Sequence, residues 1–371
     1  MKISIERNIL LKLLSHVQNV VEKRNTIPIL SNILINAKAN SVIISATDMD
    51  LSITEKVNSS VIEEGSITTP AQTLYEIVRK IPEGNEIELI ANNGSKLSVR
   101  SGKSKFSLLC LPKDDFPKIE NMSLDNEFLL NSELLKKIID KTRFAISNEE
   151  TRYYLNGVYM HIVEEAGQKS LRAVATDGHR LAKIDVSLSN EKNNVPGVII
   201  PKKTINEIRK LTEDYDGDIR ICLNETKIIF YFDNIILSSK LIDGTFPDYE
   251  KVIPKNNDKE LLVDTKLIYE AVDRVSTVSS EKSRSVKFSI LDNIISLSSN
   301  SAETGSGAED IEVNYSGEKM EIGYNAKYLL EIINQIESNK VKFKLFDASS
   351  PLIIEDPKED NALYILMPMR I

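Results

Sequence analysis

Apolar and polar positions along this chain switch between two periods, and the switching recurs about every 130 residues. Apolar residues three or four apart, such as Leu10, Leu13, Leu14, Val17 and Val21, form one face of an amphipathic helix. The same spacing recurs in five further stretches. It predicts helices over residues 7–24, 70–81, 131–143, 201–211, 264–274 and 323–336.

Between these helices the apolar residues alternate with polar ones, which is the strand period. Matching strands are expected over residues 41–48, 170–177 and 294–300, and polar turns at 92–95 and 223–226 indicate hairpins. Two helices with short antiparallel strands in each third predict an α+β fold of three repeated subdomains.

Proline marks the start of two equivalent helices and the end of two repeats. Pro70 and Pro201 stand 131 residues apart where a helix begins, and the pairs Phe116-Pro117 and Phe246-Pro247 stand 130 apart. A third copy begins near Tyr324 and has no such pair. Polar, turn-forming stretches then place three domains at residues 1–122, 127–254 and 258–371. Copies at a fixed period usually build a shape, such as a ring or an array.

Composition fits a soluble protein. The 371 residues are 41% hydrophobic and 27% charged, and no apolar run approaches the length that crosses a membrane. The N-terminal residues lack the apolar core of a signal peptide. Cys110 and Cys222 lie in apolar, strand-like surroundings and are expected to be buried free thiols, which suits a cytoplasmic location.

Charge is distributed unevenly between helices and the rest of the chain. The net charge is −8, yet the six predicted helices together carry +8 and the remainder −16. Basic helices on an acidic body are expected if the helices face a polyanion, and duplex DNA would be bound without reading its sequence. The last two helices carry −1 and 0, so the final third contributes least.

Enzymatic motifs are missing from the sequence. Three histidines and two cysteines are too scattered for a zinc site, and no phosphate loop or Gly-x-Ser-x-Gly elbow occurs, so neither a cofactor nor a metal is expected. The nearest catalytic pair is Asp177 with His179, which would make a hydrolase with His179 as general base. A tight turn is favoured instead, because the equivalent Thr47-Asp48 has no histidine beside it.

Several motifs resemble one family along the whole chain. They are residues 175–182 (Ala-Thr-Asp-Gly-His-Arg-Leu-Ala), the terminal Met-Pro-Met-Arg-Ile at 367–371, and residues 27–32, 97–102, 152–157, 238–249 and 320–325. In these the sequence resembles the bacterial sliding clamp, the beta subunit of DNA polymerase III. The resemblance implies a non-catalytic processivity factor. It also implies a head-to-tail homodimer of three-domain subunits that forms a ring around double-stranded DNA.

The resemblance implies DNA contacts at Arg24, Tyr153 and Tyr154. The two tyrosines could otherwise be strand aromatics on opposite faces, one of them exposed. Helix position adds seven candidates for the lining of the ring: Lys12, Lys136, Lys137, Lys202, Lys203, Arg209 and Lys210. Glu149 stands where a glutamine would suit DNA better.

A hydrophobic cleft between the middle and last thirds is also implied. It would receive peptide tails of the replicative polymerase's catalytic subunit, the clamp loader and other proteins with a clamp-binding motif. Two methionines offer adaptable walls, although the terminal residues could also be a core strand. Ser283 and Lys251 depart from the family pattern at the edges. The matching residues are Leu155, Thr176, Gly178, His179, Arg180, Leu181, Pro247, Val252, Asn325, Tyr328, Met367, Pro368, Met369 and Arg370.

A dimer contact between two strand edges would close each of them. In the first third a core position remains the alternative for Phe106. A protein-only scaffold that never meets DNA is the remaining alternative function. The implied contact residues are Lys103, Lys105, Phe106 and Leu108 in the first third, and Thr277, Val278, Glu309 and Asp310 in the last.

Overall fold

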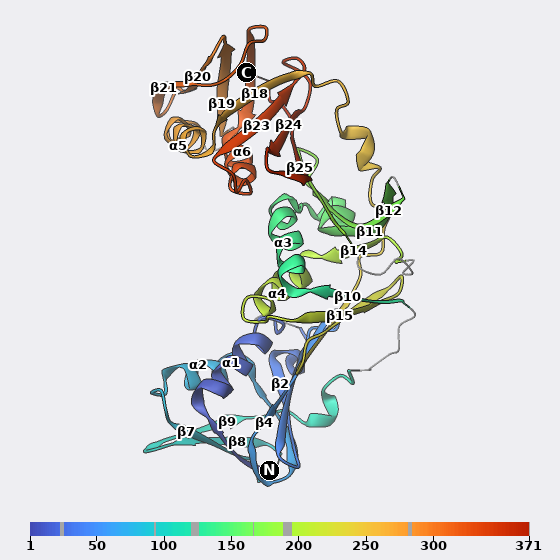
Figure 1. The fold of residues 1–371 in the computed structure, drawn as a ribbon. Helices are drawn as coiled ribbons and strands as arrows, with labels where there is room; N and C mark the ends of the chain where they lie inside the picture. Colours follow the sequence, from blue (N-terminus) through green and yellow to red (C-terminus); the bar gives the residue numbers. More distant parts are fainter. Residues whose placement is uncertain are drawn as a thin grey trace. The chain divides into compact units, whose positions relative to one another are not determined.

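The computed structural model describes residues 1–22, 26–92, 94–119, 126–165, 167–187, 195–280 and 284–370. The chain packs as two compact units, both visible in Figure 1. Unit 1 comprises residues 1–136, 192–196 and 203–241, and unit 2 comprises residues 137–191, 197–202 and 242–371. The division runs through the predicted middle third, because strands of that third belong to two different sheets.

Unit 1 contains two antiparallel sheets. The first has the order β5-β1-β7-β8-β9, and the second the order β10-β15-β16-β17-β4-β3-β2-β6. In the second sheet, strands from the first and middle thirds meet where β17 pairs with β4. The strands are β1 (Lys2–Glu6), β2 (Asn32–Lys38), β3 (Ser41–Thr47), β4 (Leu51–Asn58), β5 (Ser60–Glu63), β6 (Gly65–Pro70), β7 (Glu86–Ile90), β8 (Lys96–Ser101), β9 (Ser104–Leu109), β10 (Asn126–Asn131), β15 (Asp218–Leu223), β16 (Lys227–Tyr231) and β17 (Ile235–Lys240).

Unit 2 repeats this plan with an eight-stranded and a four-stranded sheet. Their orders are β14-β11-β12-β13-β25-β24-β23-β18 and β21-β20-β19-β22, and the middle and last thirds meet where β13 pairs with β25. The strands are β11 (Gly157–Glu165), β12 (Gln168–Thr176), β13 (Arg180–Ser187), β14 (Val198–Pro201), β18 (Lys259–Asp264), β19 (Ser285–Leu291), β20 (Ile294–Ser301), β21 (Gly305–Glu312), β22 (Met320–Asn325), β23 (Lys340–Leu345), β24 (Leu352–Asp356) and β25 (Glu359–Leu366).

Six α-helices among the described residues confirm the sequence prediction, five of them starting within one residue of the expected position. α1 and α2 pack together in unit 1, and α5 and α6 pack together in unit 2. The helices are α1 (Arg7–Val17), α2 (Ala71–Lys80), α3 (Ser132–Thr142), α4 (Lys202–Leu211), α5 (Thr265–Ser276) and α6 (Ala326–Ile333). The short 3₁₀ segments are η1 (Pro28–Ser31), η2 (Lys113–Asp115), η3 (Arg143–Ala145), η4 (Glu150–Leu155) and η5 (Tyr249–Val252).

Three predicted helix boundaries were wrong by three residues or more. One of them is the end of α6, which lies at Ile333 rather than at residue 336. α1 ends at Val17 rather than at residue 24; just past its end, the side-chain amide of Asn19 donates a hydrogen bond to the carbonyl of Ser15. α6 begins at Ala326 rather than at residue 323, because residues 323–325 complete β22. The Asn325 side chain then caps the helix by accepting a hydrogen bond from the amide of Tyr328 (3.2 Å).

Both cysteines are free, but they occupy different places in the repeat. Cys222 is buried on β15, whereas Cys110 is half-buried just past β9. Burial raises the pKa of both thiols, which keeps them protonated. In the part of the chain that the structure describes, no helix is long and apolar enough to span a lipid bilayer.

The join between β17 and β4 predicts where unit 1 is most sensitive to truncation. Leu237 on β17 is fully buried opposite Ile53, so Leu237→Ala should destabilise the protein by about 2–5 kcal/mol in urea unfolding. Leu129→Ala on β10 is the matched control, because that leucine is largely exposed. Equal effects of the two substitutions would contradict a tightly packed join.

Candidate peptide and DNA contacts

The turn between β12 and β13 is built by Asp177. One carboxylate oxygen accepts hydrogen bonds from the amides of His179 (2.9 Å) and Arg180 (3.0 Å). Gly178, between Asp177 and His179, has φ of +88°, a left-handed backbone conformation that favours glycine. These contacts confirm the tight turn.

The equivalent turn in unit 1 has the same design. A carboxylate oxygen of Asp48 accepts hydrogen bonds from the amides of Asp50 (2.9 Å) and Leu51 (2.7 Å). Asp48 has no histidine neighbour, so this carboxylate serves turn structure in both repeats. In unit 2 the ring of His179 stacks on Tyr328, with ring centroids 6.3 Å apart. The described contacts of the Asp177 carboxylate are with backbone amides and with Arg180, and none is with the imidazole.

Arg180 ties three elements of unit 2 together. Its buried guanidinium forms an ion pair with Asp177 (3.1 Å) and another with Glu331 on α6, and it donates to the carbonyl of Phe144 on η3. It also lies over the ring of Tyr328, 4.3 Å from the centroid. Arg180, predicted as a peptide contact, therefore also links the turn to η3, to α6 and to the ring of Tyr328.

The remaining predicted cleft residues range from buried to exposed. Leu155 and Leu181 belong to a buried cluster with Phe246 and Tyr249. Pro247, Val252, Met367 and Arg370 are exposed, and Thr176, Asn325, Tyr328, Pro368 and Met369 are half-buried.

Backbone contacts hold the terminal tail between the β12–β13 turn and β22. The amide of Met367 donates to the carbonyl of His179 (2.9 Å), and that of Met369 to the carbonyl of Gly323 (2.8 Å). The tail lies beyond β25 and is not a continuous core strand, because only a single bridge joins Met369 to β22. It thus leaves the Met367 side chain 39% exposed next to the turn. Ser283 lies outside the described residues.

The predicted DNA tyrosines lie on η4, not on a strand as one interpretation held. Tyr153 is 54% exposed, while Tyr154 packs against the buried cluster of unit 2, and the two rings meet edge to face. One exposed tyrosine of the pair is as predicted. Arg24 lies outside the described residues.

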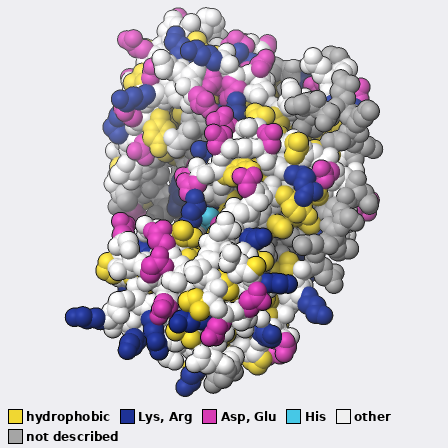
Figure 2. All heavy atoms as spheres, turned by 60° about the horizontal axis from the view of Figure 1, so that its bottom comes forward, with side chains coloured by type: hydrophobic (Ala, Val, Ile, Leu, Met, Phe, Trp, Pro, Cys, Tyr) yellow, Lys and Arg dark blue, Asp and Glu magenta, His cyan; other side chains and the backbone are white. Residues whose placement is uncertain are grey.

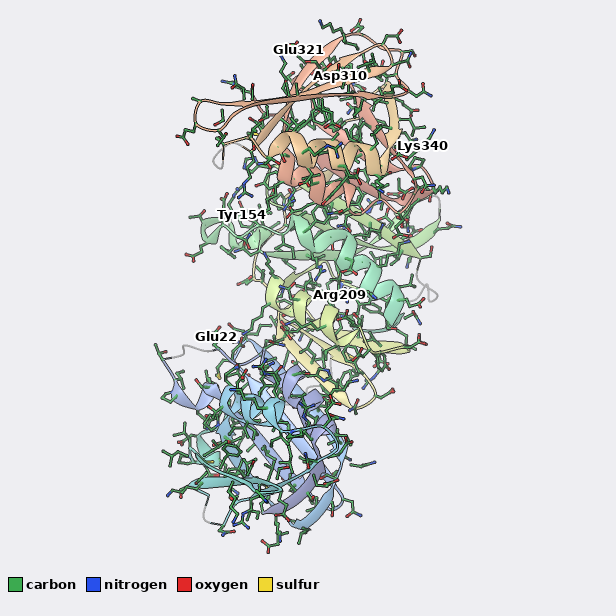
Figure 3. All side chains as sticks on the ribbon, turned by 90° about the vertical axis from the view of Figure 1, so that its left-hand side faces the viewer. Glu22, Tyr154, Arg209, Asp310, Glu321 and Lys340 are labelled. Atoms are coloured by element: carbon green, nitrogen blue, oxygen red, sulfur yellow. The ribbon has the colours of Figure 1, made fainter. Side chains whose placement is uncertain are left out.

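Most of the basic ring-lining candidates have acidic or polar partners. Lys12 pairs with Asp214 (3.4 Å), Lys137 with Glu359 (2.5 Å) and Lys210 with Glu207 (2.8 Å). Lys202 donates to the side chain of Asn148 (2.6 Å). Lys136 and Arg209 are half-buried, and Figure 3 labels Arg209 on α4. Figure 2 shows the same mixture of basic and acidic side chains on the face that it presents.

Lys203 has the most partners of these candidates. Its ammonium group pairs with Asp48, donates to the carbonyl of Val20 (2.9 Å) and lies 3.8 Å from Glu22. Sequence position could not reveal this pairing, because Asp48 is 155 residues away along the chain. The positive charge of Lys203 is thus largely neutralised by acidic partners within unit 1.

Five of the eight predicted dimer residues lie on two edge strands, β9 and β21. β9 is the last strand of the five-stranded sheet, and β21 of the four-stranded sheet. Phe106 on β9 is 40% exposed rather than core, whereas Leu108 is buried. Glu309 and Asp310 lie on β21, where Figure 3 labels Asp310, and Glu309 forms a two-point ion pair with Arg274 (2.6 and 3.0 Å). Lys103 and Lys105 are exposed beside β9, and Thr277 and Val278 follow α5.

Comparison with known proteins gives matches over the entire length. Family models described as the N-terminal, central and C-terminal domains of the DNA polymerase III beta subunit match residues 1–120, 129–248 and 250–370. The chain is 47% identical to the beta sliding clamp of Caulobacter vibrioides and 36% identical to that of Escherichia coli. Each match covers all of both chains.

Solved structures agree with these matches. The crystal structure of a sliding clamp from Bartonella birtlesii, bound to griselimycin, superposes with a TM-score of 0.97 at 46% identity, covering all of both chains. Function follows from the family: this protein is a DNA polymerase processivity factor and not an enzyme, so the hydrolase alternative is excluded. The chain belongs to the beta sliding clamp family, the beta subunits of DNA polymerase III.

Proposed function

We propose that two copies of this chain pair head to tail and close a ring around duplex DNA. The position of β9 and β21 at the ends of their sheets is the observation that carries this proposal. An unpaired edge strand exposes a row of amides and carbonyls, and pairing with a second copy would satisfy them. The three domains that build the ring are proposed at residues 1–122, 127–254 and 258–371, in a reducing cytoplasm that suits two free cysteines.

The internal joins suggest a register for the proposed dimer. β9 follows β7 and β8 as β17 follows β15 and β16, and β21 follows β19 and β20 as β4 follows β2 and β3. β17 and β4 pair with their third residues, Leu237 and Ile53, opposite each other. The same register would place Phe106 opposite Gly307 of the second copy.

Side chains at the two edges fit this register. Phe106 would cover Gly307. A Cβ built at Gly307 would lie 3.2 Å from a methyl group of Val278, so the phenyl ring would pack on an apolar side chain. Lys103 would fall opposite Asp310, an attractive pair across the join. Two such joins would complete the ring.

Inside the ring, lysines and arginines of the helices would meet phosphates in many equivalent registers, which permits sliding. Their intramolecular acidic partners weaken each contact, so enclosure rather than affinity would retain the ring. Tyr153 would stack on an unpaired base. The replicative polymerase, the clamp loader and other proteins with clamp-binding motifs would dock peptide tails between Pro247, Val252, Tyr328 and Met367. Such tethering raises the local concentration of polymerase at its template.

The proposed dimer predicts that a charge introduced on the β9 edge weakens dimerisation. Phe106→Asp buries a carboxylate in the join and should raise the dimer dissociation constant by about 100-fold or more, measured by sedimentation velocity. Phe346→Asp is the control, because Phe346 is also 40% exposed but lies outside both edges. A wild-type protein that sediments as a single subunit, or an unaffected Phe106→Asp dimer, would contradict the proposal.

Enclosure predicts topology-dependent retention. Protein loaded by its clamp loader onto nicked circular DNA should stay bound through gel filtration and leave once the DNA is cut, because a ring can slide off free ends. Equal retention on the circle and on the cut DNA would point to ordinary binding, and no retention on either to a scaffold that never meets DNA.

The cleft predicts separable peptide binding. Tyr328→Ala and Met367→Ala should each weaken a peptide from the polymerase's clamp-binding segment by about 10-fold, near 1.4 kcal/mol, while circular DNA retention persists. Tyr75→Ala on α2 is the control, since Tyr75 is also half-buried. Calorimetric titration gives the affinities, and unchanged binding in both cleft variants would place the peptide elsewhere.

A further inference from the structure

Arg172 is a buried arginine that no predicted site contains. It lies on β12 with only 3% of its surface exposed, directly opposite Asp185 on β13. Asp185 accepts two hydrogen bonds from its guanidinium (2.6 and 2.8 Å). The two outer nitrogens also donate to Glu165 (2.7 Å) at the end of β11 and to Glu250 (2.7 Å) on η5. One buried cation thus joins three strands to a segment outside the sheet.

That segment is the connector from β17 to β18, which carries one wall of the proposed cleft. Phe246 and Tyr249 point inward and are buried, whereas Pro247 and Val252 are exposed between and beyond them. Val252 is only two residues past Glu250. The position of the exposed wall therefore depends on what holds η5 against the sheet.

Two residues of the sheet, His161 and Arg172, hold η5. His161 hydrogen-bonds with the Tyr249 hydroxyl (2.9 Å), and the charge of Arg172 acts to lower the pKa of that hydroxyl. Burial raises the pKa of Tyr249 to about 12, so the hydroxyl stays protonated. The Glu250 carboxylate takes the remaining guanidinium nitrogen.

The ion pair between Arg172 and Glu250 differs in geometry from an ordinary surface pair. Exposed pairs gain little, because two long side chains must be ordered in water. Here Asp185 already fixes the plane of the Arg172 guanidinium. When Glu250 pairs with it, only the Glu250 side chain loses conformational freedom. A buried arginine needs all its donors satisfied, so losing one partner is costly. Burial by itself lowers the pKa of Arg172, but the hydrogen bonds that its guanidinium donates to Asp185 and Glu165 outweigh this effect and keep the group charged.

We propose that Arg172 is a positioning residue for peptide binding: through Glu250 and Tyr249 it sets the place of η5, and with it the Val252 wall of the cleft. This inference rests on the proposed cleft. Arg172 itself lies in the sheet beneath the connector and acts without touching peptide.

The two glutamates on Arg172 allow a matched test. Glu250 and Glu165 have side chains 53% and 71% exposed, each 2.7 Å from the same guanidinium, but only Glu250 belongs to the connector. Glu250→Gln should weaken the polymerase peptide by about 5-fold, roughly 1 kcal/mol. Glu165→Gln should leave peptide affinity at the wild-type value. Arg172→Lys keeps the charge but loses the planar fork, so it should weaken binding at least as much as Glu250→Gln.

Hydrogen–deuterium exchange supplies a second measurement. Amides of residues 249–253 should exchange faster in Glu250→Gln than in Glu165→Gln, while the unfolding midpoints of the two variants match. Equal peptide affinity and equal exchange in both variants would overturn the positioning role. If Tyr328→Ala and Met367→Ala also bind the peptide normally, the cleft itself is wrong; if they do not, only the role of Arg172 fails.

Discussion

Pairing of strands from different repeats is the constraint on which this structure depends. β17 reaches β4 in unit 1 and β13 reaches β25 in unit 2, each through antiparallel backbone hydrogen bonds. A sheet that continues across a repeat boundary leaves no edge there, whereas β9 and β21 each lie at one end of their sheet with a neighbouring strand on one side only. The proposed dimer would use these two edge strands.

The two internal joins share a backbone but differ in side-chain chemistry. At the join between β17 and β4, Asp50 pairs with Lys240 (2.9 Å) and Asp48 pairs with Lys203, so ion pairs cover the surface of this join. At the second, the residue in the place of Asp50 is His179, and Met367 follows β25 where Lys240 ends β17. An imidazole beside a thioether cannot form an ion pair. The second join therefore presents an adaptable thioether at the surface where we propose that peptides dock, although both joins share one backbone pattern.

The sequence predicted the helices, the matching strands and the Asp177 turn, because each follows from local periodicity or from bonds within four residues. It did not reveal that Lys203 belongs to Asp48, or that Arg172 gathers Asp185, Glu165 and Glu250. Asp48 is 155 residues from Lys203 and Glu250 is 78 residues from Arg172, and charge type alone does not choose among many carboxylates. The η4 helix under Tyr153 was missed for another reason: a single 3₁₀ segment is too short to establish a period.

A processivity factor that slides on DNA needs weak rather than tight contacts with phosphates. A clamp that bound phosphates tightly would stall, so ion pairs that engage Lys12, Lys137 and Lys210 suit sliding better than bare cations would. In the proposed ring, retention would come from closure around the DNA, and selectivity from the proposed peptide cleft. The walls of that cleft are a terminal tail and a connector, which are easily displaced unless anchored. Buried arginines at Arg180 and Arg172 supply the anchors, since each links a loop element to the sheet through several hydrogen bonds at once.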